Sequence, residues 1–327
     1  MKTAQKNVAV IRGGVSYEYD FSLKTGQVVL ENLPKHFTPH DILIDKKGQW
    51  HRRGMPVTPE VALRGIDVAY VALHGKYGED GLIQRTLNLL GVPFAGSNPF
   101  ESMIAQDKGK TRDALKGLVP MPQYHVVVHE HGMHYADIAR NIFAKFGPPY
   151  VVKSLRGGSS VHMRIVPNIQ QLPRALSEIA AESGDDLIVE HYLRGPEATC
   201  TLVEYMRNEE HYVLPPAEVI LPKGSQHFDF ESKLNGRAQI LCPGTFTHDI
   251  KNQLEKYTRV IHTKLGLTHF SQSDFILSHG KVYFLETDSL PSLHPHALLH
   301  AQLSAVGIPL AVYLEHVLSR AETTRRH

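Results

Sequence analysis

Three acidic side chains late in the sequence, Asp274, Glu286 and Asp288, have the type and spacing of a metal site. Asp274 lies in an apolar stretch that predicts a strand, and Glu286 ends the next such stretch after a short connection at 278–280. A hairpin would bring these carboxylates to one end, with Asp288 on the same face as Glu286. Carboxylates on rigid strands suit Mg²⁺, which keeps water and phosphate oxygens as further ligands. A solvated acidic rim would give the same pattern, and taken alone the two interpretations are equally favoured.

Two lysines and a glycine-serine turn have the chemistry of a phosphate site. The two lysines are Lys108 and Lys153. Lys153 ends an expected strand, where its ammonium would project from a buried element. The turn at 156–160 offers consecutive main-chain N–H groups and the hydroxyls of Ser159 and Ser160, which can surround phosphate oxygens. The turn matches neither a Walker loop nor a dinucleotide-binding pattern, and such a sequence is more often only a flexible turn.

Two further loops are expected at the carboxyl edge of an open sheet, where ligands of α/β proteins bind. The first, at 12–18, follows the first expected strand and carries Glu18, which could hold a substrate ammonium. The second, at 73–81, follows the third expected strand and reaches the same crevice. It can also be explained as a glycine-rich loop whose Glu-Asp pair complements the dipole of the next helix.

The elements that must position these residues alternate through the first hundred residues. Short apolar stretches predict strands at 8–12, 41–44 and 68–73, and longer amphipathic ones predict helices at 21–33 and 81–90. Strands that alternate with helices predict an open parallel α/β sheet.

The rest of the chain predicts two units of mixed α and β structure. Strands are expected at 124–128, 150–153, 161–166, 187–190, 198–203, 213–220, 270–277 and 282–286. Helices are expected at 135–146, 169–181 and 248–265, followed by two terminal helices. With boundaries near 97 and 191, the division is an N-terminal α/β domain at 1–97, a central unit at 98–191 and a C-terminal unit at 192–327.

Composition narrows the class of protein. The chain of 327 residues carries 35 Lys+Arg against 33 Asp+Glu, a near balance that argues against a general nucleic-acid binder. It contains no run of 18 apolar residues and no leading apolar segment of signal-peptide length. Its two cysteines, Cys200 and Cys242, are too few for a disulfide scaffold. These features predict a cytoplasmic protein without membrane or nucleic-acid partners.

Several longer motifs occur in a fixed order. They are GGVSYE at 13–18, FSLKTG at 21–26, LHGKYGEDG at 73–81, PFAGS at 93–97, Asp107-Lys108, VVK at 151–153 with SSV at 159–161, VEHYLRGPE at 189–197, and SDFIL at 273–277 with FLETDSLP at 284–291. In this order they resemble the D-alanine–D-alanine ligases of the ATP-grasp superfamily over nearly the whole chain. The resemblance implies a two-subdomain ATP-grasp fold behind the N-terminal domain, with ATP between the subdomains and two Mg²⁺ ions, or Mn²⁺ in their place. It also implies a homodimer that serves peptidoglycan synthesis, in which ATP phosphorylates one D-alanine carboxylate and the amine of a second D-alanine attacks the acyl phosphate.

The resemblance also implies roles for individual residues. Lys108 and Lys153 match phosphate-contacting lysines, and Ser159 and Ser160 match a flap over the triphosphate. Glu190 through Tyr192 and Leu193 match a hinge beside adenine, and Glu197 matches a residue that contacts the ribose. Asp274, Glu286 and Asp288 match the metal ligands, and Glu18 with His74 matches the anchor of the first amino acid. Lys233 matches a lysine near the transferred phosphoryl group and the acceptor carboxylate. Glu18, Ser159 and Lys233 are the expected catalytic residues.

The departures from the family concentrate in the acceptor half of the site. The family has Arg where this chain has Gln272, Tyr at Leu234, Gly at Ser292 and Ser at Ala297. Within the flap, Gly157 replaces Glu and His162 replaces Gly; Asp288 replaces the usual Asn among the metal ligands. Loss of an oxyanion contact such as the missing Arg typically costs about 2.7–4 kcal/mol.

Three functions follow. The favoured one is a D-alanine–D-alanine ligase with a rearranged acceptor site, in which Arg12, Arg156, His294 or His296 supplies the missing positive charge. The second is an ATP-grasp ligase for another acceptor, one without an α-carboxylate. The third, a nucleotide-binding paralogue without activity, is least favoured because a pure binder needs no Glu18 anchor.

Overall fold

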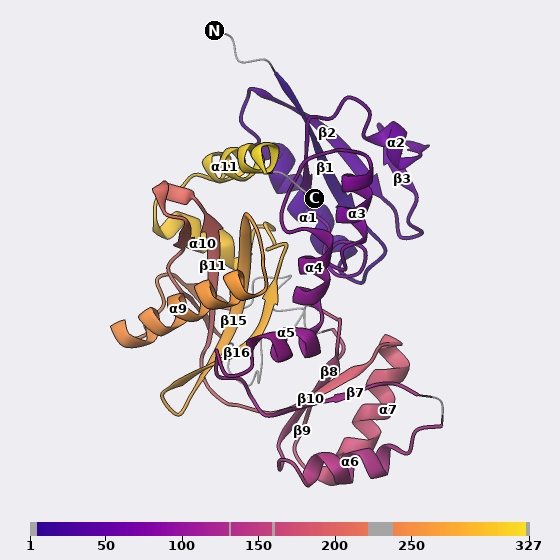
Figure 1. Ribbon diagram of the computed structural model, residues 1–327, viewed down its shortest axis with the longest axis vertical. Coiled ribbons are helices and arrows are strands. Elements are labelled where there is room, and N and C mark those ends of the chain that lie inside the picture. Colours follow the sequence, from indigo (N-terminus) through magenta and orange to yellow (C-terminus); the bar gives the residue numbers. More distant parts are fainter. Residues whose placement is uncertain (1–4, 131, 159–160, 222–237, 325–327) are drawn as a thin grey trace.

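The computed structural model describes residues 5–130, 132–158, 161–221 and 238–324. The predicted site residues Ser159, Ser160 and Lys233 lie outside these ranges, as does Leu234. Three β-sheets are arranged along the long axis of the molecule, with helices packed against each (Figure 1). The expected α/β fold class is confirmed.

The N-terminal sheet is built on buried parallel strands, as the sequence predicts. The strands β1 (Lys6–Gly13), β2 (Phe37–Ile44), β5 (Val68–Val71) and β6 (Phe94–Ala95) run parallel in the order β2-β1-β5-β6. The helices α1 (Tyr19–Asn32), α2 (Pro59–Ala62) and α3 (Leu82–Leu89) connect them. A hairpin of β3 (Trp50–Arg52) and β4 (Met55–Val57) extends the sheet beyond β2 in antiparallel fashion and was not predicted. Strands this short carry too little alternation to be recognised.

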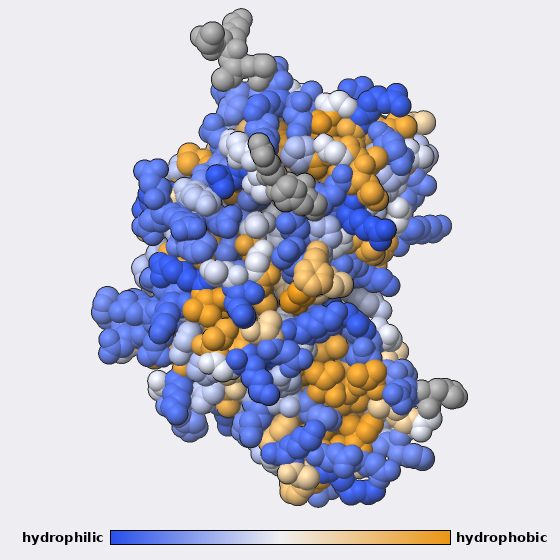
Figure 2. All heavy atoms as spheres, in the orientation of Figure 1, coloured by the Kyte–Doolittle hydropathy of each residue, from blue (hydrophilic) through white to orange (hydrophobic). Residues whose placement is uncertain are grey.

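The second sheet is antiparallel and covered on one side by helices. Its order is β7 (Tyr124–Val127), β10 (Leu187–His191), β8 (Tyr150–Ser154) and β9 (Met163–Val166). The helices α6 (Tyr135–Phe143) and α7 (Leu172–Ser183), the latter preceded by the 3-10 turn η1 (Ile169–Gln171), bury Ile142 and Leu176 against Val152. We call this unit the lower lobe, after its place in Figure 1. Most of the face seen in Figure 2 is hydrophilic, and apolar side chains gather on this lobe.

The third sheet holds the acidic hairpin. Its order is β14 (Gln239–Leu241), β13 (Ala217–Ile220), β11 (Glu197–Glu204), β15 (Phe270–Ser278) and β16 (Lys281–Asp288), with β12 (His211–Val213) also paired to β11 after the turn η2 (Met206–Asn208). The long helix α9 (His248–Lys264) packs on it. The single strand expected at 213–220 is wrong, because Pro215 and Pro216 have no N–H to donate and separate β12 from β13.

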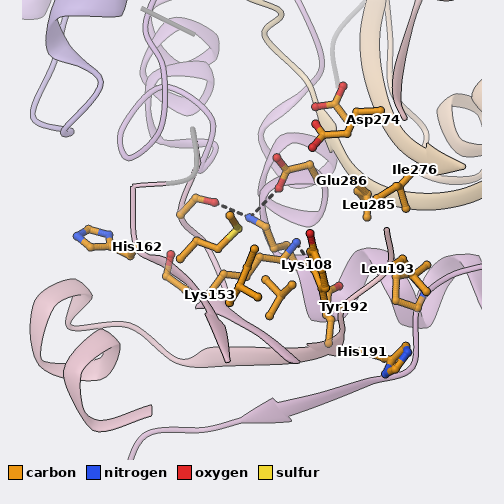
Figure 3. A pocket seen from close by; sticks show the side chains of 18 of the residues that line it. Lys108, Lys153, His162, His191, Tyr192, Leu193, Asp274, Ile276, Leu285 and Glu286 are labelled. Atoms are coloured by element: carbon orange, nitrogen blue, oxygen red, sulfur yellow. Dashed lines mark hydrogen bonds and ion pairs between the residues drawn. The ribbon is translucent and has the colours of Figure 1, made fainter. Parts of the chain in front are cut away.

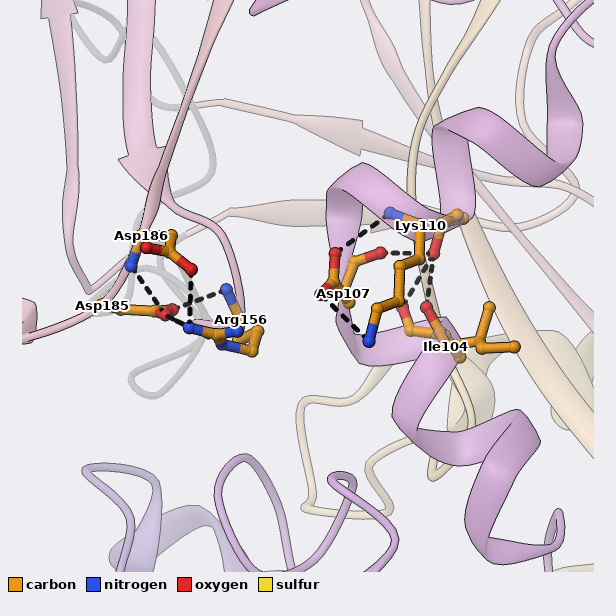
Figure 4. Close-up of polar contacts among 8 residues, drawn as sticks. Ile104, Asp107, Lys110, Arg156, Asp185 and Asp186 are labelled. Atoms are coloured by element: carbon orange, nitrogen blue, oxygen red, sulfur yellow. Dashed lines mark hydrogen bonds and ion pairs between the residues drawn. The ribbon is translucent and has the colours of Figure 1, made fainter. Parts of the chain in front are cut away.

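Two helices between the sheets were not predicted. The helix α4 (Pro99–Gln106) begins after Asn98, with proline in its first turn, and α5 (Lys108–Leu115) follows at once. The Asp107 carboxylate accepts the N–H of Lys110 at 3.0 Å and so caps α5 (Figure 4). The proline that begins α4 and the cap of α5 were the available signals, since the segment has no clear apolar period.

The helices α10 (Leu298–Ala305) and α11 (Leu310–Thr323) return the chain to the first sheet. Tyr313, Leu314 and Val317 of α11 lie in the same apolar core as Val10 of β1 and Tyr70 of β5. The three-part division at 97 and 191 stays a prediction. No single described helix has the length and apolar character of a membrane span; α10 and α11 meet the criterion only as a pair, which is bent by 103°.

Candidate active site

A cavity of about 500 Å³ lies between the second and third sheets (Figure 3). Its size falls in the range of sites for nucleotide-sized ligands. It brings together most of the residues predicted for nucleotide and metal: Lys108, Lys153, Glu190, Tyr192, Leu193, Glu197, Asp274 and Glu286. Apolar side chains complete the walls: Val151, Met163, Ile165, Ile276 and Leu285. A flat aromatic group could be buried at the apolar end while anionic groups face the lysines.

The two lysines reach the cavity from different elements. Lys108, at the start of α5, lies with its Nζ 3.3 Å from Oε2 of Glu286 and donates to the carbonyl of Gly157. Lys153, on β8, lies with its Nζ 2.9 Å from Oε2 of Glu190. Burial lowers the pKa of Lys153, although Glu190 and Glu286 oppose the change. Each ammonium group lines the cavity beside a carboxylate, and a lysine is a compact point charge suited to phosphate oxygens.

Glu190 holds Lys153 in place through a buried charge network. Its carboxylate also pairs with the guanidinium of Arg112, a side chain with no solvent exposure. Arg112 donates in addition to the carbonyl of Leu285 at 2.8 Å, which ties α5 to β16. Burial alone would raise the pKa of Glu190, but the charges of Arg112 and Lys153 together lower it. Sequence reasoning missed Arg112, because no local pattern links positions 78 residues apart.

The acidic hairpin is formed as expected. Asp274 on β15 pairs in register with Glu286 on β16, and Gln272 pairs with Asp288. The hydroxyl of Thr199 on β11 donates to Oδ1 of Asp274 at 2.6 Å, which fixes this carboxylate. The register places Asp274 and Glu286 directly opposite each other, a spacing suited to a shared divalent cation.

A second, smaller cavity of about 90 Å³ adjoins the first. It is lined by Glu18 and His74, the residues expected to anchor the first amino acid, and by Asp288. Gly158, Asp274 and Glu286 line both cavities. The two chambers therefore meet at the acidic hairpin and the glycine turn.

Glu18 lies in a tight contact with two glycines. A Cβ on Gly75 would come within 2.5 Å of its Oε2, and one on Gly158 within 3.0 Å. Beside it, the rings of Tyr17 and His162 meet edge to face at 5.0 Å between centroids. The first loop of the N-terminal sheet therefore touches the glycine turn of the lower lobe, which closes the second chamber.

Two histidines of this chamber are held neutral by burial. Nε2 of His74 lies 3.0 Å from Oγ1 of Thr25, which in turn lies 3.1 Å from Oγ of Ser292. Burial lowers the pKa of His74 to about 4. Burial, aided by the neighbouring His74 and His296, lowers the pKa of His294 to about 3. At neutral pH both imidazoles can donate and accept hydrogen bonds but carry no charge.

Glu79 is a chamber residue that sequence reasoning missed. Its carboxylate accepts the N–H of Gly75 at 3.0 Å. Burial, with the nearby charges of Asp288 and Glu18, raises its pKa well above the ordinary value. The signal was present in the loop at 73–81, where the Glu-Asp pair was also explained as a helix start.

No lysine or arginine of the described ranges lines the second chamber. Arg12 instead pairs with Asp41 at 2.6 Å, and Arg156 pairs with Asp185 at 2.5 Å (Figure 4). Neither supplies the positive charge considered for the acceptor. His294 and His296 do line the chamber, but burial keeps His294 neutral, so His294 does not supply that charge either. The substituted positions Gln272, Ser292 and Ala297 line it as well.

Comparison with known proteins agrees with this geometry. The family model "D-ala D-ala ligase C-terminus" matches residues 115–319, and "D-ala D-ala ligase N-terminus" matches 52–97. A D-alanine–D-alanine ligase of Desulforudis audaxviator is 31% identical over 97% of this chain and 99% of its own. One of Geobacter sulfurreducens is 32% identical over 96% and 94%. A solved Bacillus anthracis ligase in complex with ATP superposes with a TM-score of 0.78 at 25% identity, covering 97% of both chains.

The C-terminal family model alone covers more than half of the chain, including the acidic hairpin, and the relatives align along almost the full length of the chain. The protein therefore belongs to the D-alanine–D-alanine ligase family.

Proposed function

We propose that the protein is an ATP-dependent ligase that joins two D-alanines through an acyl phosphate. One observation carries the proposal: the large and small cavities share Gly158, Asp274 and Glu286. A nucleotide in the first chamber would present its terminal phosphate at the point where the second chamber opens. A carboxylate held there near Glu18 would be in line to receive it.

The side chains fit such a transfer. Phosphoryl transfer needs positioning and charge neutralisation more than covalent assistance. Lys108 and Lys153 would neutralise the nucleotide phosphates, and Glu18 would bind the ammonium of the first amino acid. The carboxylate oxygen attacks the γ-phosphorus and ADP leaves; the amine of the second amino acid then attacks the acyl carbon, and inorganic phosphate leaves. The contact between Tyr17 and His162 would shield the acyl phosphate from water.

Divalent cations fit the acidic end of the site. Burial, with the nearby charges of Asp288 and Glu18, raises the pKa of Glu79. Asp274, Glu286 and Asp288 would hold Mg²⁺, or Mn²⁺ in its place, as two ions. Bound Mg²⁺ would supply neutralisation of the phosphate oxygens. We also propose the homodimer and the cytoplasmic location that the family resemblance implies.

The direct test combines ADP formation with mass spectrometry of the products from ATP, Mg²⁺ and D-alanine. Glu286→Gln should slow ADP formation on the order of 100-fold, as expected for loss of one charge contact in a transition state. The matched control, Glu178→Gln on the surface of α7, should retain wild-type rates. Equal rates in Glu286→Gln and wild type would refute the assignment of the hairpin.

A second candidate is a ligase that uses a different acceptor. Among the described residues, the lining of the second chamber offers uncharged groups at Gln272, Ser292 and Ala297 where an acceptor carboxylate would need a cation. Under the first function, Gln272→Arg should improve the use of D-alanine as acceptor. Under the second, Gln272→Arg should not help, and a product with another amine or hydroxy acid should dominate the mass spectrum.

A further inference from the structure

A cluster of two histidines and a glutamate lies outside both chambers. Glu204 ends β11, His211 begins β12, and His262 lies in the last turns of α9. One ligand atom from each lies within 4.8 Å of the other two. Imidazole nitrogen is a ligand for transition metals, whereas Mg²⁺ and Ca²⁺ prefer oxygen ligands alone, so two imidazoles beside one carboxylate favour a transition metal. We propose that Glu204, His211 and His262 form a binding site for a divalent transition metal, with Zn²⁺ as the ion.

The spacing of the ligand atoms fits a tetrahedral ion. Nε2 of His262 lies 3.4 Å from Oε1 of Glu204. Two ligands at about 2.05 Å from a tetrahedral Zn²⁺ are separated by about 3.3 Å, so this pair already has the required separation. His211 pairs in register with Glu204 on the adjacent strand and is half-buried, so a small rotation of its ring can complete the set. Three protein ligands leave the fourth position to water.

The groups behind the ligands are arranged to orient them. Nδ1 of the buried His262 lies 2.8 Å from Oγ of Ser271, so Nδ1 can carry the ring proton while Nε2 faces Glu204. The other oxygen of Glu204 accepts the N–H of His269 at 2.7 Å, which leaves Oε1 for the ion. Such outer hydrogen bonds fix the tautomer and direction of metal ligands.

The site is separate from the proposed active site and does not depend on the proposed function. Thr199, which holds Asp274, precedes Glu204 by five positions on β11, or about 17 Å along an extended strand. A metal here would join β11, β12 and α9. It would also hold the turn at 205–208, where Tyr205, Arg207 and Asn208 adopt positive φ.

The test uses the full chain, free of any histidine tag and stripped with a chelator. Zn²⁺ is titrated in competition with a chromophoric chelator, and Co²⁺ is followed by its visible absorption. Wild type should bind one Zn²⁺. His211→Ala should lower the affinity for this ion at least about tenfold, and Ser271→Ala should lower it by about tenfold because the His262 ring is no longer oriented. Zn²⁺ should also raise the Tm of wild type but not of His211→Ala.

Two controls separate this site from other ligands. His279→Ala, an exposed histidine on the β15–β16 turn, should bind as wild type does. Asp274→Asn should keep the His211-dependent binding, so failure of the proposed active site and failure of this proposal give different results. Because His211 is half-buried at a strand end, its variant should fold; Glu204→Gln provides the second test. Superimposable Zn²⁺ isotherms for wild type and His211→Ala, or a Co²⁺ spectrum without tetrahedral bands, would overturn the proposal.

Discussion

Glu190 is buried between two cations, and its removal should therefore harm the fold as well as the site. Arg112 is fully buried and relies on Glu190 for its counter-charge. Breaking one side of a buried ion pair typically costs about 3–5 kcal/mol because the other charge is left unpaired. We expect Glu190→Gln to lower the free energy of unfolding in urea by about 3 kcal/mol. Glu178→Gln, which breaks an exposed pair with Arg174, should cost less than about 0.5 kcal/mol; equal losses would contradict the network.

His74 should make stability depend on pH. Burial lowers its pKa from 6.5 to about 4, so as pH falls the unfolded chain takes up this proton before the folded one. The contribution is fully present above pH 6.5 and is lost progressively down to about pH 4. Between about pH 7 and pH 5 the loss should be about 2 kcal/mol.

Urea unfolding at the two pH values checks this expectation. His74→Gln should lose about 2 kcal/mol less than wild type over the same interval. His279→Gln, on an exposed turn, should follow wild type. If His74→Gln and wild type lost stability in parallel, the histidine would not be buried in its neutral form.

At the scale of elements, β11 is the strand of the third sheet that pairs with the acidic hairpin. Thr199 and Thr201 lie on the same face of this strand. The hydroxyl of Thr199 donates to Asp274, whereas the hydroxyl of Thr201 donates to Gln302 at 2.7 Å. Thr199→Val should raise the Mg²⁺ concentration needed for half-maximal ADP formation by about tenfold. This is the usual effect of removing a side chain that hydrogen-bonds to a metal ligand. Thr201→Val loses a similar hydrogen bond and should leave the Mg²⁺ requirement unchanged. A shared change would indicate a general effect of strand packing.

Local patterns predict elements well where burial repeats along the chain. The strands at 8–12 and 68–73 and the helices at 21–33 and 248–265 are found within a few residues of their expected places. The helices α4 and α5 were missed because a proline in the first turn of α4 and a side-chain cap on α5, not apolar periodicity, mark where they begin. Short edge strands such as β3 and β4 depend on the neighbour they join.

The residue types of the site were predictable, but the hydrogen bonds and ion pairs between them were not. The hairpin of Asp274 and Glu286 follows from two adjacent strands and a short turn, which is local information. The engagement of Glu190 with Arg112, and of Thr199 with Asp274, joins positions far apart in sequence. The periodicity of apolar residues cannot predict such pairs, since they form only when separate elements pack together.

At the scale of the whole molecule, α11 should be essential to the N-terminal sheet. Leu314 is fully buried in the core that it shares with β1 and β5. We expect Leu314→Ala to lower the free energy of unfolding by about 2–5 kcal/mol, the usual cost of a cavity at a buried leucine. Val312→Ala, on the same helix but 47% exposed, should change it little. Similar values for the two variants, measured in urea, would contradict the packing of α11.

That packing also bears on how the protein is made. A ribosome delivers the strands of residues 6–95 well before residues 310–323, whose Tyr313, Leu314 and Val317 complete their shared core. The nascent sheet must therefore leave the exit tunnel with an apolar face still bare. The sheet finishes folding only after α11 has been synthesised.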